Sequence, residues 1–292
     1  MAVTLGRVRA LAWKTPAPVV VAGLAFLVCF WRPIVTLGRD WWTDPDAGHG
    51  LLLFPVAVYL AWRRGVVREP RPQHALGLAL LVASVLLRYA SGLAAELFTM
   101  RASLIGAAMG LIVYVYGVRQ LRRWLLPLLL VILSVPLPVV VLGSIALPLQ
   151  LTASRWGAAL LELRHVPVRL AGNVIQLPGQ TLFVTEACSG LRSLTALIAL
   201  GLLVAGLWLR NRWIRSLLIL LAIPVAMALN AMRVFLTGFF VYYVDPRLAE
   251  GVMHLTEGWV IFVVAFAILG ALAFVLRAVE GHLRPAAGES AA

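Results

Sequence analysis

The chain has 292 residues, of which 62% are hydrophobic and only 13% carry a charge. Soluble domains carry about 25% charged residues, so the composition excludes an ordinary soluble domain and indicates a protein surrounded by lipid. The formal net charge of +13 would suggest nucleic acid as a partner. The basic residues are instead distributed as expected for the cytoplasmic loops of a membrane protein, so a nucleic-acid partner is not needed to explain the charge. Two cysteines exclude a disulfide framework.

Apolar runs that are long enough, or nearly so, to cross a bilayer follow one another along the chain. A spanning helix needs about 20 mainly apolar residues. The sequence predicts an all-α membrane protein, a single polytopic domain over residues 1–284 followed by a disordered tail at 285–292. Its spans are expected at about residues 17–37, 49–62, 75–95, 102–117, 125–147, 190–209, 214–236 and 258–276.

Basic residues gather at every second boundary between these predicted spans. On one side, 15 basic residues face three acids, Glu69, Glu280 and Glu289, which leaves a balance of +12. On the other side, 10 basic residues face nine acids, a balance of +1. Because loops on the cytoplasmic side are enriched in Lys and Arg, both termini are predicted to be cytoplasmic. We call the opposite, less basic side the outer side.

The longest outer segment is predicted at residues 148–189. Its first part has helical periodicity with polar interruptions and is expected to lie along the membrane interface. Its second part alternates Val, Ile and Phe with polar residues. Turn signals interrupt it at Ala171-Gly172-Asn173 and at Leu177-Pro178-Gly179. These features predict a small insertion of one helix and one or two β-hairpins on the extracytoplasmic side.

The segment that joins this insertion to the sixth predicted span reads "TEACSGLRS". Cys188 falls at the outer N-terminus of the span, where unpaired backbone N–H groups and the helix dipole favour a thiolate. Arg192 is four residues further on and shares a helix face with Cys188. Gly190 allows a substrate backbone to approach closely. A lone cysteine is usually a small buried hydrophobe, but its polar neighbours favour a chemical role here.

Two further polar features occur near the outer ends of the last two spans. Asn230 and Arg233 lie three residues apart on one face of the seventh span, where an arginine usually faces a cavity or a partner. His254 stands just before the eighth span, in "MHLTEGW". The topology therefore predicts that a thiol, a guanidinium and an imidazole converge on one side of the membrane.

These motifs together resemble the exosortase/archaeosortase family of polytopic membrane sorting enzymes. "EACSGLRSL", "NAMR" and "HLTEG" follow one another in the order of the family's Cys-Ser-Gly, Asn-x-x-Arg and His motifs. "GHGLLLFPVAVYLAW", which contains His49, resembles the family's N-terminal His-Gly segment. "GNVIQLPG" resembles the stretch that precedes the cysteine. The resemblance extends over about residues 45–275.

The resemblance implies a cysteine transpeptidase or protease in the cell membrane, with its active site on the extracytoplasmic side. Its substrates would be secreted proteins with a C-terminal signal made of a short motif such as Pro-Glu-Pro, a transmembrane helix and a basic cluster. Cys188 would be the nucleophile, His254 the general acid and base, and Arg233 the oxyanion donor. The supporting residues would be Asn230, Ser189, Gly190, Arg192, Glu186 and His49. No zinc-ligand spacing or glycine-rich phosphate loop is present, so no metal or cofactor is expected.

Three alternatives remain open at this point. A transporter or channel would use Arg88, Glu96, Glu186 and Arg233 as charges along its pathway. A noncatalytic assembly factor would only hold substrate helices in the membrane. An intramembrane serine protease would use Ser189 or Ser193 as its nucleophile, although the sequence has no Gly-x-Ser-x-Gly motif around either.

Overall fold

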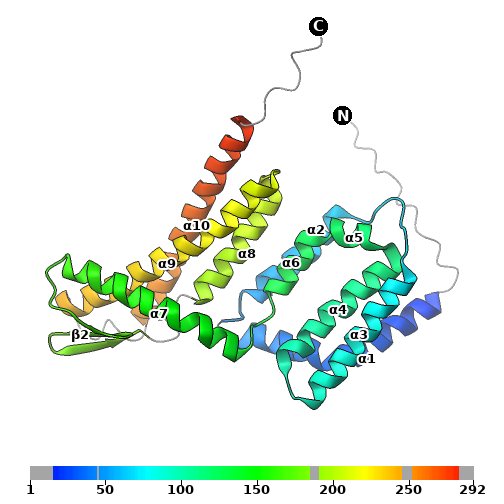
Figure 1. Cartoon of the computed structure of the whole chain (residues 1–292), viewed down its shortest axis with the longest axis horizontal. Helices are drawn as coiled ribbons and strands as arrows, with labels where there is room; N and C mark the ends of the chain where they lie inside the picture. Colours follow the sequence, from blue (N-terminus) through cyan, green and yellow to red (C-terminus); the bar gives the residue numbers. More distant parts are fainter. Residues whose placement is uncertain (1–15, 45, 185–190, 245–251, 283–292) are drawn as a thin grey trace, which may run out of the picture.

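The computed structural model describes residues 16–44, 46–184, 191–244 and 252–282. In the first half of the chain, helices follow one another with short connections, and α3 and α4 pack side by side (Figure 1). These helices are α1 (Pro16–Thr43), α2 (Gly50–Arg64), α3 (His74–Leu93), α4 (Leu97–Tyr116), α5 (Val118–Arg123) and α6 (Leu125–Leu133).

The second half of the chain combines four helices with a small sheet. Helix α9 contacts α7, α8 and α10, and α6 contacts α8, so the two halves meet along α6 and α8. Figure 1 shows α7 running at an angle to α8 and α10. The elements are α7 (Val139–Glu162), β1 (Arg169–Ala171), β2 (Val174–Leu177), β3 (Gln180–Phe183), α8 (Leu191–Trp208), α9 (Arg212–Tyr243) and α10 (Val252–His282).

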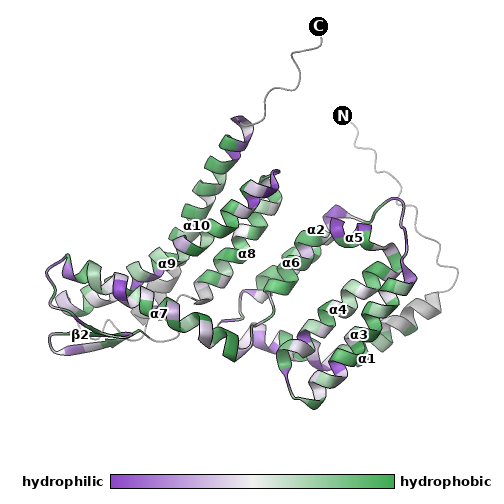
Figure 2. Cartoon of the chain, viewed as in Figure 1, coloured by the Kyte–Doolittle hydropathy of each residue, from purple (hydrophilic) through white to green (hydrophobic). Residues whose placement is uncertain are grey.

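The helices carry the apolar surface that a bilayer requires. Among the described residues, four helical stretches are long and apolar enough to cross a membrane: His74–Leu93, Leu97–Tyr116, Arg212–Tyr243 and Val263–His282. Large hydrophobic side chains point outward from them and from their neighbours, including Leu93 at 74% and Phe274 at 70% exposure. Figure 2 shows hydrophobic colour along most helical surfaces and hydrophilic colour concentrated near α5 and at helix ends. The chain is therefore an α-helical, multi-pass membrane protein.

The predicted span at 125–147 is wrong, because the structure breaks it into two helices. Helix α6 ends at Leu133, and α7 begins only at Val139. The intervening Ser-Val-Pro-Leu-Pro sequence contains Pro136 and Pro138, which have no backbone N–H and disfavour helical geometry in the residue before them. Hydropathy continues through the break, but helical hydrogen bonding does not.

Glycines allow α3 and α4 to pack backbone against backbone. A Cβ added at Gly77 would lie 2.5 Å from the Cα of Tyr114, and one added at Gly106 would lie 2.7 Å from the hydroxyl of Ser84. Helices in membranes use such small residues because close approach maximises van der Waals contact where no hydrophobic effect drives association. The interface between α3 and α4 thus requires residues without a side chain at Gly77 and Gly106.

The insertion after α7 contains a three-stranded antiparallel sheet in the order β1-β2-β3. Two-residue turns join its strands, with Gly172 at φ +64° and Gly179 at φ +75°, conformations that glycine adopts without strain. Ile175 and Leu177 of β2 are buried, and they form a cluster with Leu161 of α7 and Val241 of α9. The two predicted hairpin turns are confirmed, and the sheet is packed on the ends of α7 and α9.

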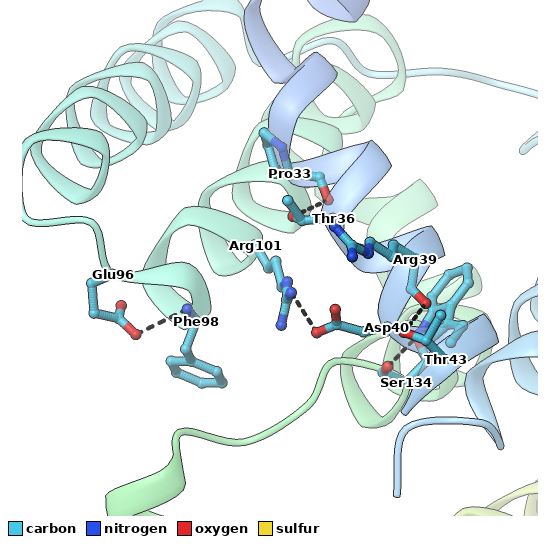
Figure 3. Close-up of polar contacts among 10 residues, drawn as sticks. Pro33, Thr36, Arg39, Asp40, Thr43, Glu96, Phe98, Arg101 and Ser134 are labelled. Carbon is cyan, nitrogen blue, oxygen red and sulfur yellow. Dashed lines mark hydrogen bonds and ion pairs between the residues drawn. The ribbon is translucent and has the colours of Figure 1, made fainter. Parts of the chain in front are cut away.

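A polar network joins α1 to α4 at the ends predicted to face outward (Figure 3). Arg101, which is 3% exposed, donates from Nη2 to Oδ2 of Asp40 at 2.6 Å. Glu96 caps α4 by accepting hydrogen bonds from the backbone N–H groups of Phe98 and Thr99. Hydrogen bonds from the Thr99 hydroxyl and backbone, followed by that from Phe98, lower the pKa of the Glu96 carboxyl.

Polar side chains also fasten the opposite ends of the helices. Gln120 of α5, which is fully buried, accepts from the N–H of Val67 at 2.8 Å and donates to the carbonyl of Gly65 at 3.2 Å. Glu280 of α10 accepts from the N–H groups of Arg210 and Asn211, just before α9 begins. Because buried polar groups must be paired, these bonds fix the connections between helices at the ends predicted to be cytoplasmic.

Candidate functional site

A small cavity lies where α8, α9 and α10 meet. Its walls include Asn230 and Arg233 from α9, together with Ser193 from α8. Apolar side chains complete the lining: Leu197, Ala226, Leu229, Ile261 and Ala265. The cavity therefore places an amide and a guanidinium next to the first turn of α8 and beside α10.

Helix α9 sets the positions of Asn230 and Arg233. Residues three apart in a helix share a face, and here that face is the one that packs toward α8 and α10. Asn230 is 5% exposed, and it also lines a second narrow pocket with Leu149 and Thr152 of α7. Arg233 is partly buried. The expectation that these two side chains face inward is confirmed.

The proposed nucleophile and its nearest neighbours lie outside the described residues. These are Glu186, Cys188, Ser189 and Gly190. Cys188 precedes Leu191, the first residue of α8, by only three positions in the chain.

The predicted general acid and one supporting residue are described only by their backbone. His254 is the third residue of α10, and Ile261, which lines the cavity, follows it two helical turns later. Arg192 is the second residue of α8. The side chains of both residues lie outside the described part of the structure. Their helices are nevertheless two of the three that enclose the cavity.

His49 is not part of the cavity lining. It stands immediately before α2, and its Nε2 lies 3.1 Å from the carbonyl oxygen of Leu133 at the end of α6. This contact places His49 on the side of α8 that packs against α2 and α6, whereas Asn230 and Arg233 lie on the side that packs against α9 and α10. Among the supporting residues whose side chains the structure describes, His49 and Asn230 therefore lie on different sides of α8.

The residues of the alternative functions fall in different places. Ser193 lines the cavity, although as the third residue of α8 it is further along the helix than Cys188. Glu96 is the N-cap of α4, a structural role that satisfies two backbone N–H groups. Arg88, also named for a transport pathway, belongs to α3, which contacts α4. Of the charges named for a transporter, only Arg233 lines this cavity among the residues that the structure describes.

Sequence reasoning missed the polar network at the outer ends of α1 and α4. Asp40 and Arg101 are 61 positions apart in the chain, and neither belongs to a motif. Trp41, the next residue after Asp40, donates from Nε1 to the carbonyl oxygen of Ser134 at 2.8 Å. The available signal was two opposite charges at predicted outer helix ends, but pairing them requires knowing that α1 packs against α4.

The comparisons with known proteins agree with this architecture. A model of the transmembrane exosortase family matches residues 41–271, a stretch that begins before His49 and ends within α10. Neither the curated proteins nor the solved structures contain a match. The matched stretch covers more than half of the chain and includes all the motifs in their expected order. The chain therefore belongs to the transmembrane exosortase family.

Proposed function

We propose that this exosortase is a membrane-embedded cysteine endopeptidase or transpeptidase that cleaves the C-terminal sorting signal of secreted proteins at the outer side of the membrane. The observation that carries the proposal is the cavity at the start of α8, in which Asn230 and Arg233 face the helix that Cys188 precedes. Family membership supports the reaction class. The proposed topology suits a substrate whose transmembrane helix lies beside the enzyme and whose basic end stays in the cytoplasm.

Cys188 would act as the nucleophile. Its thiolate attacks the scissile carbonyl, and the tetrahedral intermediate collapses to a thioester as the C–N bond breaks. The departing amine takes its proton from the His254 imidazolium, which had received the thiol proton when the thiolate formed. Water or an amine then attacks the thioester and releases Cys188. The products are a free carboxylate in hydrolysis and a new amide in transpeptidation.

Arg233 would stabilise the negative oxygen that develops on the scissile carbonyl. A partly buried guanidinium is well suited to this task, because its N–H donors lie in a rigid plane and its charge is permanent. Asn230, buried one helical turn away, would hold the arginine in place. Removal of a single such donor typically slows catalysis about 10²- to 10³-fold, so Arg233→Gln should have an effect of that size.

The decisive experiment is a Cys188→Ala variant co-expressed with a tagged substrate. The proposal predicts that processing is lost while the variant keeps its melting temperature and still binds substrate. Ser189→Ala serves as the matched control and should process normally. Normal processing by the Cys188→Ala variant would refute a cysteine mechanism, and loss in Ser189→Ala would favour a serine nucleophile. Mass spectrometry of the new substrate C-terminus distinguishes a free carboxylate from an added acceptor.

A further inference from the structure

A second cavity, of about 280 Å³, opens between α8 and α10 at the ends predicted to be cytoplasmic. Its walls are formed by Leu207, Trp208, Arg210, Arg277, Glu280 and Gly281. It shares no residue with the cavity around Arg233. Along α8, about 15 residues separate Ser193 from Trp208, which corresponds to roughly 22 Å of helix. This cavity is therefore separate from the candidate active site.

Two guanidinium groups line this cavity from different elements. Arg210 stands in the connection between α8 and α9, and Arg277 belongs to the last turns of α10. Figure 2 shows hydrophilic colour at both places. Both side chains are exposed, and within the part of the chain that the structure describes neither guanidinium forms an ion pair. Two like charges on one cavity repel each other, and a negative group between them removes that cost. The cavity therefore favours an anion.

Glu280 is the acid of the cavity wall, and its carboxylate binds backbone groups. Both of its oxygens accept from the N–H group of Arg210 at 3.0 Å, and one also accepts from that of Asn211 at 2.5 Å. The side chain is buried. These bonds fasten α10 to the start of α9 and hold the backbone of Arg210 at the cavity wall. The lining keeps two positive charges against one negative charge.

The cavity stands at the level where a bilayer carries its phosphate groups. Arg210 and Arg277 are the first residues after the predicted sixth and eighth spans. Trp208 is half-exposed, and tryptophan is enriched at membrane–water interfaces. Phe274 is three residues before Arg277 on the same face of α10, and its ring is exposed. The site thus combines positive charge for a head group with apolar surface on the membrane side of it.

The space for a ligand depends on Gly281. This residue lines the cavity one helical turn after Arg277, and a Cβ added to it would meet no atom within 4 Å. A volume of about 280 Å³ approaches the roughly 300 Å³ at which small-molecule sites begin. The cavity is therefore large enough for a phosphate group and its glycerol substituent, whereas acyl chains would have to lie outside it.

We propose that this cavity binds the phosphodiester head group of an anionic phospholipid in the cytoplasmic leaflet. Arg210 and Arg277 donate to the phosphate oxygens, because a planar guanidinium matches phosphate with two parallel donors. The acyl chains follow the exposed surface of α10 at Phe274. Basic pockets between membrane helices on the cytoplasmic side are suited to such head groups. This inference does not depend on the reaction proposed for the outer side.

Native mass spectrometry of the full-length protein in a neutral detergent tests the site, with dioleoylphosphatidylglycerol as the titrated probe. Arg277→Gln should weaken binding of the first lipid about fivefold, and Arg210→Gln/Arg277→Gln about 25-fold, which is the effect of one and of two basic side chains near a membrane surface. Both variants should keep the parental melting temperature, because the backbone bonds of Glu280 remain. Parental lipid binding by the double variant would overturn the proposal.

Arg212→Gln is the matched control for charge. It removes an equal charge two positions from Arg210, but the Arg212 guanidinium lies over the Trp213 ring, 5.4 Å from its centre, and does not line the cavity. Lipid binding by this variant should stay within about twofold of the parent. Equal losses in Arg212→Gln and Arg277→Gln would mean that the lipid responds only to the diffuse charge of this side of the protein, which would contradict a defined site.

Gly281→Leu tests the cavity with all of its charges kept. The added side chain should occupy the space of the head group and weaken binding about as much as Arg277→Gln, and parental binding would place the lipid elsewhere.

Two further probes identify the ligand. Dioleoylphosphatidylcholine carries a choline cation and should bind more weakly than the anionic lipid, and equal binding would contradict recognition of the head group. Glycerol phosphate should displace the lipid only at a concentration at least about 100-fold higher, because it lacks the acyl chains. Displacement at equal concentrations would assign the cavity to a soluble phosphate ester and overturn the lipid proposal.

Discussion

At the scale of single residues, Arg101 is a buried charge that forms an ion pair with Asp40. It is 3% exposed, and among the described contacts Asp40 provides its ion pair at 2.6 Å. Asp40→Leu should lower the free energy of unfolding by about 3 kcal/mol, because the guanidinium remains buried without its counter-charge. Unfolding in mixed micelles, followed by tryptophan fluorescence, measures the change.

The double variant Asp40→Leu/Arg101→Met is the control for this prediction. It removes both charges together, and replacing a buried ion pair by apolar side chains is often neutral or stabilising. The double variant should therefore be more stable than Asp40→Leu alone. If the single and the double variant lost the same free energy of unfolding, Asp40 would act through its own packing and not through the charge of Arg101.

Residue-level reasoning succeeded where a motif lies within one helix. The spacing of Asn230 and Arg233 predicted a shared inward face, and both side chains line the cavity. It was less informative for Glu96, named as a possible pathway charge, which is bonded to the backbone of Phe98 and Thr99 as a helix cap. A cap depends on where a helix begins, and boundaries are the part of a helix that hydropathy defines least well.

At the scale of elements, the α3–α4 pair depends on glycine. Gly77→Ala should lower the free energy of unfolding by about 2 kcal/mol, since the added methyl group would meet the Tyr114 backbone at 2.5 Å and overpack the interface. Gly38→Ala in α1 is the matched control. A Cβ there meets nothing within 4 Å, so the substitution should be neutral or stabilising. Equal melting temperatures for the two variants would contradict the close packing.

The break between α6 and α7 shows why element boundaries need the structure. The run from 125 to 147 has the hydropathy of a span, and yet it is divided at residues 134–138. The divided form is stabilised by bonds from distant residues, because Trp41 and His49 satisfy the carbonyls of Ser134 and Leu133. The prolines were visible in the sequence, whereas the partners that make the break favourable were not.

At the scale of the whole molecule, the distribution of charge predicts which side each connection faces. Thr181 in β3 and Glu69 between α2 and α3 are both exposed and are predicted to lie on opposite sides. Single cysteines at these positions, with Cys29 and Cys188 replaced by alanine, can be labelled by a membrane-impermeant maleimide. In intact cells whose inner membrane the maleimide can reach from outside, the cysteine of Thr181→Cys should be labelled. The cysteine of Glu69→Cys should be labelled only after the membrane is permeabilised. The reverse pattern would invert the topology.

The sequence by itself determined the membrane class, most helices, the two hairpin turns and the inward face of α9, because each depends on local composition, glycine conformation or helical periodicity. The tertiary structure decided which helices contact one another. It therefore decided the pairing of Arg101 with Asp40, the division of α6 from α7 and the orientation of His49. These features join residues tens of positions apart, and the free energy that selects them comes from burying and pairing polar groups between helices. No local sequence pattern predicts which polar groups from different helices will pair.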